Sequence, residues 1–161
     1  MYAGFDIVTG QVMVELSPTH NAQDFLRLMR KIVRRHKGKK KIHVVLDNAS
    51  VHACGETSKW LAEQDGRVIF HFTPTGASWM NQIEIWNGII TRQLIRRGTF
   101  SSVKVVNNAI KRFTADWNTD AKPFRWTATA DEIIDKVRAV ISRMGKLLGA
   151  TEIGHVIPRA A

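Results

Sequence analysis

Residues 43–52, HVVLDNASVH, decide how the rest of the sequence is interpreted. A short, nearly continuous apolar run of this kind is typical of a strand buried on both faces of a sheet. The run ends in Asp47 and Asn48, and His52 follows five residues after the aspartate. Functional groups gather beyond the carboxyl ends of such strands, so Asp47 is a candidate functional carboxylate. Asp–Asn is also good turn chemistry, and on this stretch alone the turn interpretation is the stronger one.

The segments around this strand predict an α/β domain. Two strand-like runs flank the turn at Thr9–Gly10 and predict a β-hairpin over residues 2–16. Asn21 is expected to cap a helix that runs to about Arg35. The remaining expected elements are a strand at 41–47, a helix at 56–64, a strand at 67–72, a helix at 79–97, a helix capped by Ser101 and a last helix at 129–148.

The charge of the chain favours a polyanionic partner. Lys and Arg outnumber Asp and Glu by 24 to 14, which gives a net charge of +10. A surplus of this size favours nucleic acid, because phosphate contacts release counterions. Eight of the cationic residues lie in residues 30–41, RKIVRRHKGKKK. That block is either the solvated end of a helix with its loop, which is the simpler interpretation, or a contact to the DNA backbone.

Other functional classes find little support in the composition. Cys54 is the single cysteine, so an internal disulfide is excluded, and a small helix residue is a better interpretation of it than a reactive thiol. No apolar run approaches the roughly 20 residues that span a membrane, and the first residues lack the layout of a signal peptide. We therefore expect a cytoplasmic protein with no membrane partner and no small-molecule substrate.

A second stretch, TPTGASWMNQIEIWNGII at residues 73–90, strengthens the functional interpretation of Asp47. Its helix carries an apolar stripe made of Ile83, Trp86, Ile90 and Leu94. Asn81, Glu84 and Gly88 follow at helical spacing on a neighbouring face. Glycine inside a helix costs about 1 kcal/mol, which suggests that this face approaches a backbone or a ligand. Beside a strand-end aspartate, Glu84 becomes a candidate metal ligand.

Together, LDNASVH and HFTPTGASWMNQIEIW resemble the catalytic core of the DDE transposases, the bacterial insertion-sequence relatives of the mariner superfamily. In this family a strand Asp and a helix Glu or Asp lie some three dozen residues apart, and here they are 37 apart (84 − 47). The flanks RQLIRRGTFSSV and WNTDAKPFRWTATADEI resemble the same family. The resemblance implies a ribonuclease-H-like (integrase-like) fold that cleaves DNA and transfers strands with metal ions. The transposase-like flanks disfavour a ribonuclease or another nuclease of the same fold.

The resemblance also implies roles for individual residues. Asp47 and Glu84 would be the second and third carboxylates of the catalytic triad and would hold two Mg²⁺ or Mn²⁺ ions, for which carboxylates are suitable ligands. Asn48 and Asn81 would position ligands or phosphate oxygens. His52 matches a frequent histidine of the family that contacts DNA or a leaving group, and it is an equally good structural residue at a helix start. The DNA-binding candidates are Trp79, Arg92, Arg96 and Arg97.

The chain departs from the family pattern at its start. The first triad Asp lies on a strand before the hairpin, and Asp6 matches a non-catalytic position, so we expect an N-terminally truncated domain whose two-ion site is incomplete. The expected layout is a core at about 1–98, further helices at about 101–148 and a poorly ordered tail at 149–161. The expected partners are transposon ends and target DNA, with the unpaired hairpin edge favouring self-association as a dimer. The alternative function is a non-catalytic DNA-binding remnant of a transposase.

Overall fold

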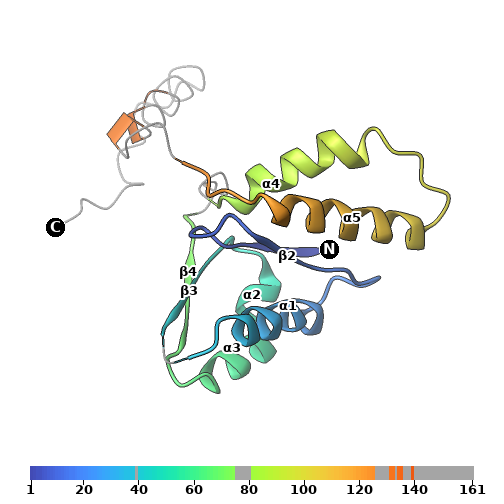
Figure 1. Cartoon of the computed structure of the whole chain (residues 1–161). Helices are drawn as coiled ribbons and strands as arrows, with labels where there is room; N and C mark the ends of the chain where they lie inside the picture. The colour runs from blue at the N-terminus through green and yellow to red at the C-terminus, as the bar shows by residue number, and fades with distance from the viewer. Residues whose placement is uncertain (39, 75–80, 126–130, 133, 136–138, 140–161) are drawn as a thin grey trace, which may run out of the picture. The chain divides into compact units, whose positions relative to one another are not determined.

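The computed structural model describes residues 1–38, 40–74, 81–125, 131–132, 134–135 and 139. The chain divides into two compact units, Met1–Phe124 and Arg125–Ala161, and the elements given below belong to the first. Strands and helices alternate in its first half, and helices follow (Figure 1). This order confirms the predicted α/β class. In the described part of the chain, no helix is both long and apolar enough to cross a membrane.

The predicted hairpin is present as β1 (Tyr2–Phe5) and β2 (Val12–Glu15), which pair antiparallel. Its turn depends on Gly10, whose φ of 76° lies in the left-handed region that favours glycine. A Cβ at Gly10 would also lie 2.2 Å from the carbonyl carbon of Lys122. The indole N–H of Trp117 donates to the Gly10 carbonyl at 2.9 Å, so the turn is held by the end of a helix more than 100 residues later.

Asp6 serves this hairpin turn. Its Oδ1 accepts the backbone N–H of Val8 at 2.9 Å and that of Thr9 at 3.2 Å. Burial raises the pKa of Asp6, but these hydrogen bonds and the nearby His36 outweigh burial, so the pKa lies below its ordinary value. The carboxylate is therefore occupied by a local structural task.

Helix α1 (Ala22–Arg35) begins and ends as the sequence predicts. The Asn21 side chain accepts the backbone N–H of Asp24 at 3.0 Å, and the Asp24 carboxylate accepts the N–H of Asn21 at 3.4 Å. This reciprocal capping box satisfies two donors that the first turn of a helix leaves unpaired. The helix start is thus fixed by residues three positions apart.

Two parallel strands, β3 (Ile42–Leu46) and β4 (Val68–Phe72), follow α1. Parallel neighbours need a crossover connection. Here it consists of the short helices α2 (Ser50–Ala53) and α3 (Gly55–Ala62). The single helix predicted at 56–64 is therefore preceded by a separate helical turn, which carries His52.

The helices after β4 differ in two details from the expectation. The predicted helix at 79–97 appears in the described residues as α4 (Ile83–Ile90), which continues into a π-helical turn, η2 (Thr91–Ile95). Helix α5 (Val103–Thr119) is capped by the Ser102 side chain, which accepts the N–H of Val105 at 3.3 Å; Ser101 as the cap was wrong. The last predicted helix, 129–148, lies almost wholly outside the described residues, as does the predicted tail at 149–161.

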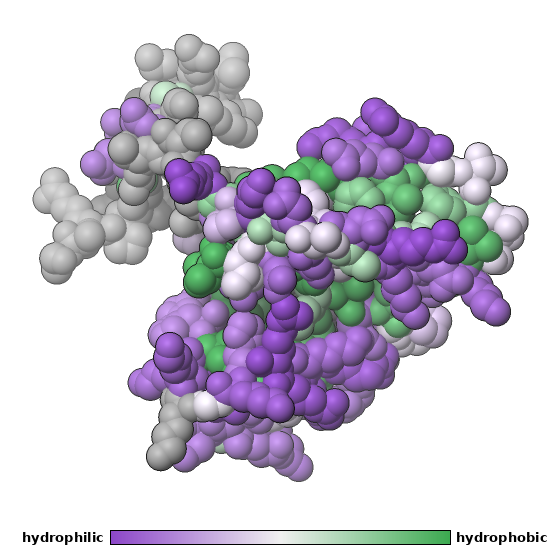
Figure 2. Space-filling view, in the orientation of Figure 1, coloured by the Kyte–Doolittle hydropathy of each residue, from purple (hydrophilic) through white to green (hydrophobic). Residues whose placement is uncertain are grey.

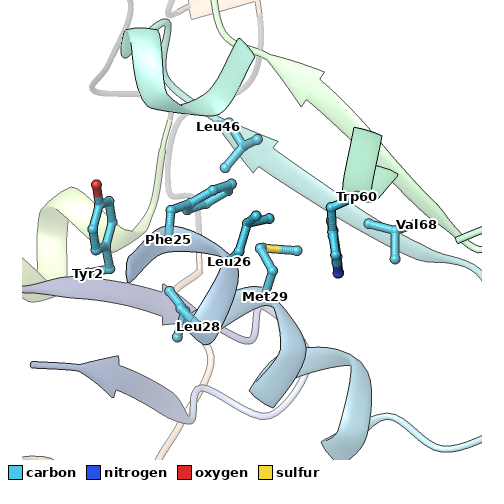
Figure 3. Packing of buried hydrophobic residues seen from close by; sticks show 8 residues of the cluster. All are labelled: Tyr2, Phe25, Leu26, Leu28, Met29, Leu46, Trp60 and Val68. Atoms are coloured by element: carbon cyan, nitrogen blue, oxygen red, sulfur yellow. The ribbon is translucent and has the colours of Figure 1, made fainter. Parts of the chain in front are cut away.

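Helix α1 is the centre of the larger of two hydrophobic clusters (Figure 3). One of its faces packs on the hairpin, and the cluster extends to the parallel strands and α3. The buried members are Tyr2, Phe25, Leu26, Leu28, Met29, Leu46, Trp60 and Val68. Because β1, β3 and β4 all contribute to this cluster, α1 joins the two pairs of strands.

A second cluster covers the other face of the hairpin with α4 and α5. It contains the predicted apolar stripe of α4, with Trp86 fully buried and Ile90 2% exposed. Ile83 and Leu94 pack at its margin. The hairpin is thus a middle layer between α1 and the α4–α5 pair, and the stripe fixes the rotation of α4 about its axis. That rotation decides where Glu84 points.

The four strands form two separate two-stranded sheets, β1–β2 and β3–β4. Within the residues that the structure describes, β3 pairs only with β4, and β1 pairs only with β2. One edge of β3 and one edge of β1 therefore have no strand neighbour in the described chain. An unpaired edge exposes backbone donors and acceptors that another strand can use.

Candidate catalytic site

Asp47 is the first residue after β3, at the carboxyl end of the parallel sheet. Its Oδ1 lies 2.9 Å from His52 Nδ1 and accepts the backbone N–H of Ala49 at 3.3 Å. Both contacts use one oxygen, and the carboxylate side chain is 43% exposed. The second oxygen is therefore accessible to a ligand, while the first one is held in place.

His52 reaches Asp47 from helix α2. Its Nδ1 contacts the Asp47 carboxylate and lies 3.1 Å from the Asp47 carbonyl oxygen. Both partners are acceptors, so Nδ1 carries the hydrogen. The ring packs against Phe25 with a centroid distance of 4.6 Å, and the side chain is only 11% exposed. This geometry agrees with the interpretation of His52 as a structural residue at a helix start. Packing holds the His52 ring in place, and the ring in turn orients Asp47.

Asn48 connects the ends of the two parallel strands. Its Nδ2 donates to the Thr73 carbonyl at 2.7 Å, next to the ladder bond from Thr73 N–H to the Leu46 carbonyl at 2.8 Å. Thr73 is 6% exposed, so this contact is largely shielded from water. One N–H of the Asn48 amide is thereby engaged in the fold, and its other N–H and its oxygen are left for the ligand-positioning role that the resemblance implies.

Glu84 lies in the first turn of α4 and is exposed. Its backbone N–H donates to the Asn81 carbonyl at 3.0 Å, and Asn81 Oδ1 accepts the N–H of Ile83 at 3.4 Å. Asn81 thus lies one residue before Gln82, the N-cap of α4, and accepts two N–H groups of the first turn of this helix. In the described residues, the Asn81 side chain contacts the helix start and no other candidate site residue.

An open groove of about 340 Å³ runs along the helix from Glu84. It is lined by Glu84, Asn87, Gly88, Thr91, Arg92 and Arg96. No backbone atom of the described residues closes on Gly88: a Cβ there would meet only the Arg92 guanidinium, at 3.5 Å. The glycine therefore leaves space in a groove, and a close helix contact does not explain it.

The structure thus sorts the predicted residues into two neighbourhoods. Asp47, Asn48 and His52 lie together at the end of the parallel sheet. Glu84 shares its groove with Arg92 and Arg96, and Arg97 does not line this groove. The connecting residues 75–80, which include Trp79, lie outside the described residues. In the described part of the chain, no three His, Cys, Asp or Glu side chains are grouped closely enough to hold a metal ion.

Two residues of the groove, Asn87 and Thr91, were missed by the sequence interpretation. Asn87 Oδ1 is buried and has no hydrogen-bond partner among the described residues, which is unusual because buried acceptors are nearly always paired. The sequence could have indicated Asn87, because it follows Glu84 by three residues and residues three apart share a helix face.

The basic block at residues 30–41 is partly used inside the fold. Lys31 forms an ion pair with Glu15 of β2, and Arg35 donates to the Gln11 side chain. These contacts fix α1 to the hairpin, in agreement with the simpler interpretation of the block as a helix end.

An α/β domain with one exposed carboxylate at a strand end and another beside two arginines offers oxygen ligands for hard cations and cationic groups for phosphate. Residues 1–107 match the model of a protein family described as the DDE superfamily endonucleases. The chain belongs to this family. Membership implies a ribonuclease-H-like fold and, at the level of the family, a transposase-type endonuclease that acts on DNA with divalent metal ions. No curated protein and no solved structure gave a significant match to the chain.

Proposed function

We propose that this chain is part of a transposase catalytic domain, in which Asp47 and Glu84 bind the divalent ions that support DNA cleavage and strand transfer. The observation that carries the proposal is the state of Asp47: an exposed carboxylate at the carboxyl end of a parallel strand, held through one oxygen by a largely buried histidine. A carboxylate whose only task was to form a turn would need the Ala49 N–H contact and not the additional contact with His52. The family match covers both Asp47 and Glu84.

The chemistry of the available donors fits magnesium or manganese. Asp47 and Glu84 both offer carboxylate oxygens on exposed side chains. Hard cations such as Mg²⁺ prefer oxygen ligands, and they commonly use only one or two carboxylates. When bound, a pair of such ions stabilises the attacking and leaving oxygens of an in-line displacement at phosphorus.

Each neighbouring residue then has a definite task. His52 holds Asp47 Oδ1, so that Oδ2 faces the ligand in a fixed orientation. Asn48 keeps the ends of β3 and β4 together, which fixes the backbone on which Asp47 stands. Asn81 accepts the backbone N–H of Glu84 and so supports the first turn of the helix that presents this carboxylate. Outer contacts of this kind hold metal-binding carboxylates in place and are important to their affinity.

We further propose that the third carboxylate comes from a strand outside residues 1–161. Support comes from the free edge of β3: a parallel strand added there would end beside Asp47, because the carboxyl ends of parallel strands meet at one edge of a sheet. Among the described residues, no three His, Cys, Asp or Glu side chains are grouped closely enough to hold a metal ion. With two carboxylates, residues 1–161 would bind a cation loosely and would leave the second ion without an anchor.

DNA cleavage tests this proposal. The substrate is DNA that includes the sequences flanking the coding region, supplied with Mg²⁺. We expect residues 1–161 to stay near background and a form extended upstream, to include a strand with an acidic residue, to cleave at the element ends. Robust, end-specific cutting by residues 1–161 alone would show that no third carboxylate is required. Salt-sensitive DNA binding by the extended form without cutting would favour the alternative, a non-catalytic DNA-binding remnant.

A further inference from the structure

The π turn Thr91–Ile95 changes which arginine faces Glu84. In a straight α-helix each residue turns the chain by about 100°, so Arg96, twelve positions after Glu84, would lie about 120° away from it. A π turn contains one extra residue, as the bond from Arg96 N–H to the Thr91 carbonyl at 2.9 Å shows. When the extra residue is left out of the count, Arg96 lies within about 20° of Glu84 around the helix axis. Arg97 then lies about 120° away from Glu84.

The groove agrees with this geometry. Glu84, Arg92 and Arg96 line it, and Arg97 does not. The Arg92 guanidinium lies over Gly88, where an added Cβ would meet it at 3.5 Å. In the described residues no carboxylate forms an ion pair with Arg92 or Arg96, although ion pairs occur elsewhere in the same unit. Figure 2 shows a hydrophilic surface over this end of the helix.

The charges in the groove identify the ligand class. Two guanidiniums without an ion-pair partner among the described residues are strong donors to phosphate oxygens, which they bind with directed hydrogen bonds. Glu84 in the same groove would repel a bare phosphate, but a divalent cation at the carboxylate reverses that effect. A phosphodiester beside a cation matches the whole groove: the cation at the Glu84 end and the phosphate oxygens at the arginines.

We propose that the groove along α4 and η2 is a phosphodiester-binding site, in which the π turn places Arg96 beside Arg92 on the Glu84 face and excludes Arg97. The proposal rests on the proposed function in taking a DNA strand as the ligand and in placing a divalent cation at Glu84. It separates the three arginines of the RQLIRR segment, which are equivalent in the sequence: two bind the phosphate next to the site, and the third lies on another face of the helix.

The first test measures binding of a labelled DNA duplex to residues 1–161 by fluorescence anisotropy, at a constant concentration of Mg²⁺ and over a range of salt concentrations. Arg92→Gln and Arg96→Gln should each lower the slope of log affinity against log salt by about 1 and lower affinity about eightfold at 0.1 M salt. Arg97→Gln is the matched control and should change affinity by less than about twofold, because a rim charge outside the groove makes no phosphate contact. Equal losses in all three variants, or none in Arg96→Gln, would overturn the proposal.

The second test addresses the π turn. The double variant Ile95→Arg/Arg96→Gln moves the guanidinium one position earlier in the sequence. In a straight α-helix, residue 95 would lie within about 20° of Glu84, so the moved arginine would face the groove. With the π turn, residue 95 faces away from the groove. Ile95 is 38% exposed, so the fold tolerates arginine there. We expect the double variant to bind as weakly as Arg96→Gln, and recovery of wild-type affinity would contradict the π register. Neither assay depends on cleavage, so an inactive protein with these binding differences would reject the proposed catalysis and keep the phosphodiester site.

Discussion

Replacing Glu84 with Gln in a cleavage-competent form of the protein is expected to reduce Mg²⁺-dependent DNA cleavage at least about 10³-fold, or about 4 kcal/mol of transition-state stabilisation. Glutamine keeps the size and one acceptor oxygen but removes the charge that holds the cation. Asp47→Asn should cause a loss of the same order for the same reason. The measurement is the rate of strand cleavage at saturating protein.

Two controls make this result specific. Glu63→Gln removes an exposed glutamate at the end of α3 and should leave cleavage unchanged. Because Glu84 is exposed and forms no ion pair with a described residue, Glu84→Gln should also leave the unfolding midpoint within the range of ordinary surface substitutions, about 0.5 kcal/mol. A Glu84→Gln protein that cleaves within tenfold of wild type would remove Glu84 from the catalytic site.

The largest effect on stability is expected at Asn118. Its Oδ1 accepts the Val12 N–H at 2.7 Å and its Nδ2 donates to the Val12 carbonyl at 2.8 Å, so one side chain completes the edge of β2 as a neighbouring strand would. Val12 is 1% exposed. Asn118→Ala leaves both backbone groups unpaired in a dry environment, at about 1–3 kcal/mol each, and we expect a loss of about 2–5 kcal/mol.

Urea unfolding of residues 1–161 measures this effect, with Asn108→Ala as the control. Asn108 is an exposed asparagine on the same helix, so its replacement tests the change in helix propensity alone. Asn118→Asp keeps an oxygen that accepts the Val12 N–H but loses the N–H that donates to the Val12 carbonyl. Its loss of stability should therefore be at least the cost of leaving one buried carbonyl unpaired. An Asn118→Ala protein as stable as Asn108→Ala would show that water satisfies Val12 and that this clamp contributes little.

The elements predicted correctly are those whose signals are local. The cap of α1 at Asn21 precedes its helix directly, and the apolar run before Asp47 identifies β3 without any distant contact. The apolar stripe of α4 also follows from helical spacing alone. In each case the signal lies within a few turns or one strand, and the structure confirms it.

The features that the sequence did not reveal depend on contacts or on irregular backbone. Asn118 and Val12 are 106 positions apart, and no local pattern connects an asparagine on a helix to a strand edge. The π turn changes the residue count on which helical-face arguments depend, so the grouping of Arg96 with Glu84 was not accessible from a regular period. The contact of His52 with Asp47 required the helical turn α2, which the sequence interpretation left out.

The central claim is that Asp47 and Glu84 bind the same metal centre, and locating manganese by anomalous scattering tests it most directly. Crystals of the cleavage-competent form would be soaked in Mn²⁺, which replaces Mg²⁺ and can be placed without ambiguity. We expect two ions about 4 Å apart, with a carboxylate oxygen of each residue at about 2.1 Å from an ion. Carboxyl groups more than about 10 Å apart, or manganese at one residue and not the other, would contradict a shared centre, because two ions at that spacing cannot span the gap.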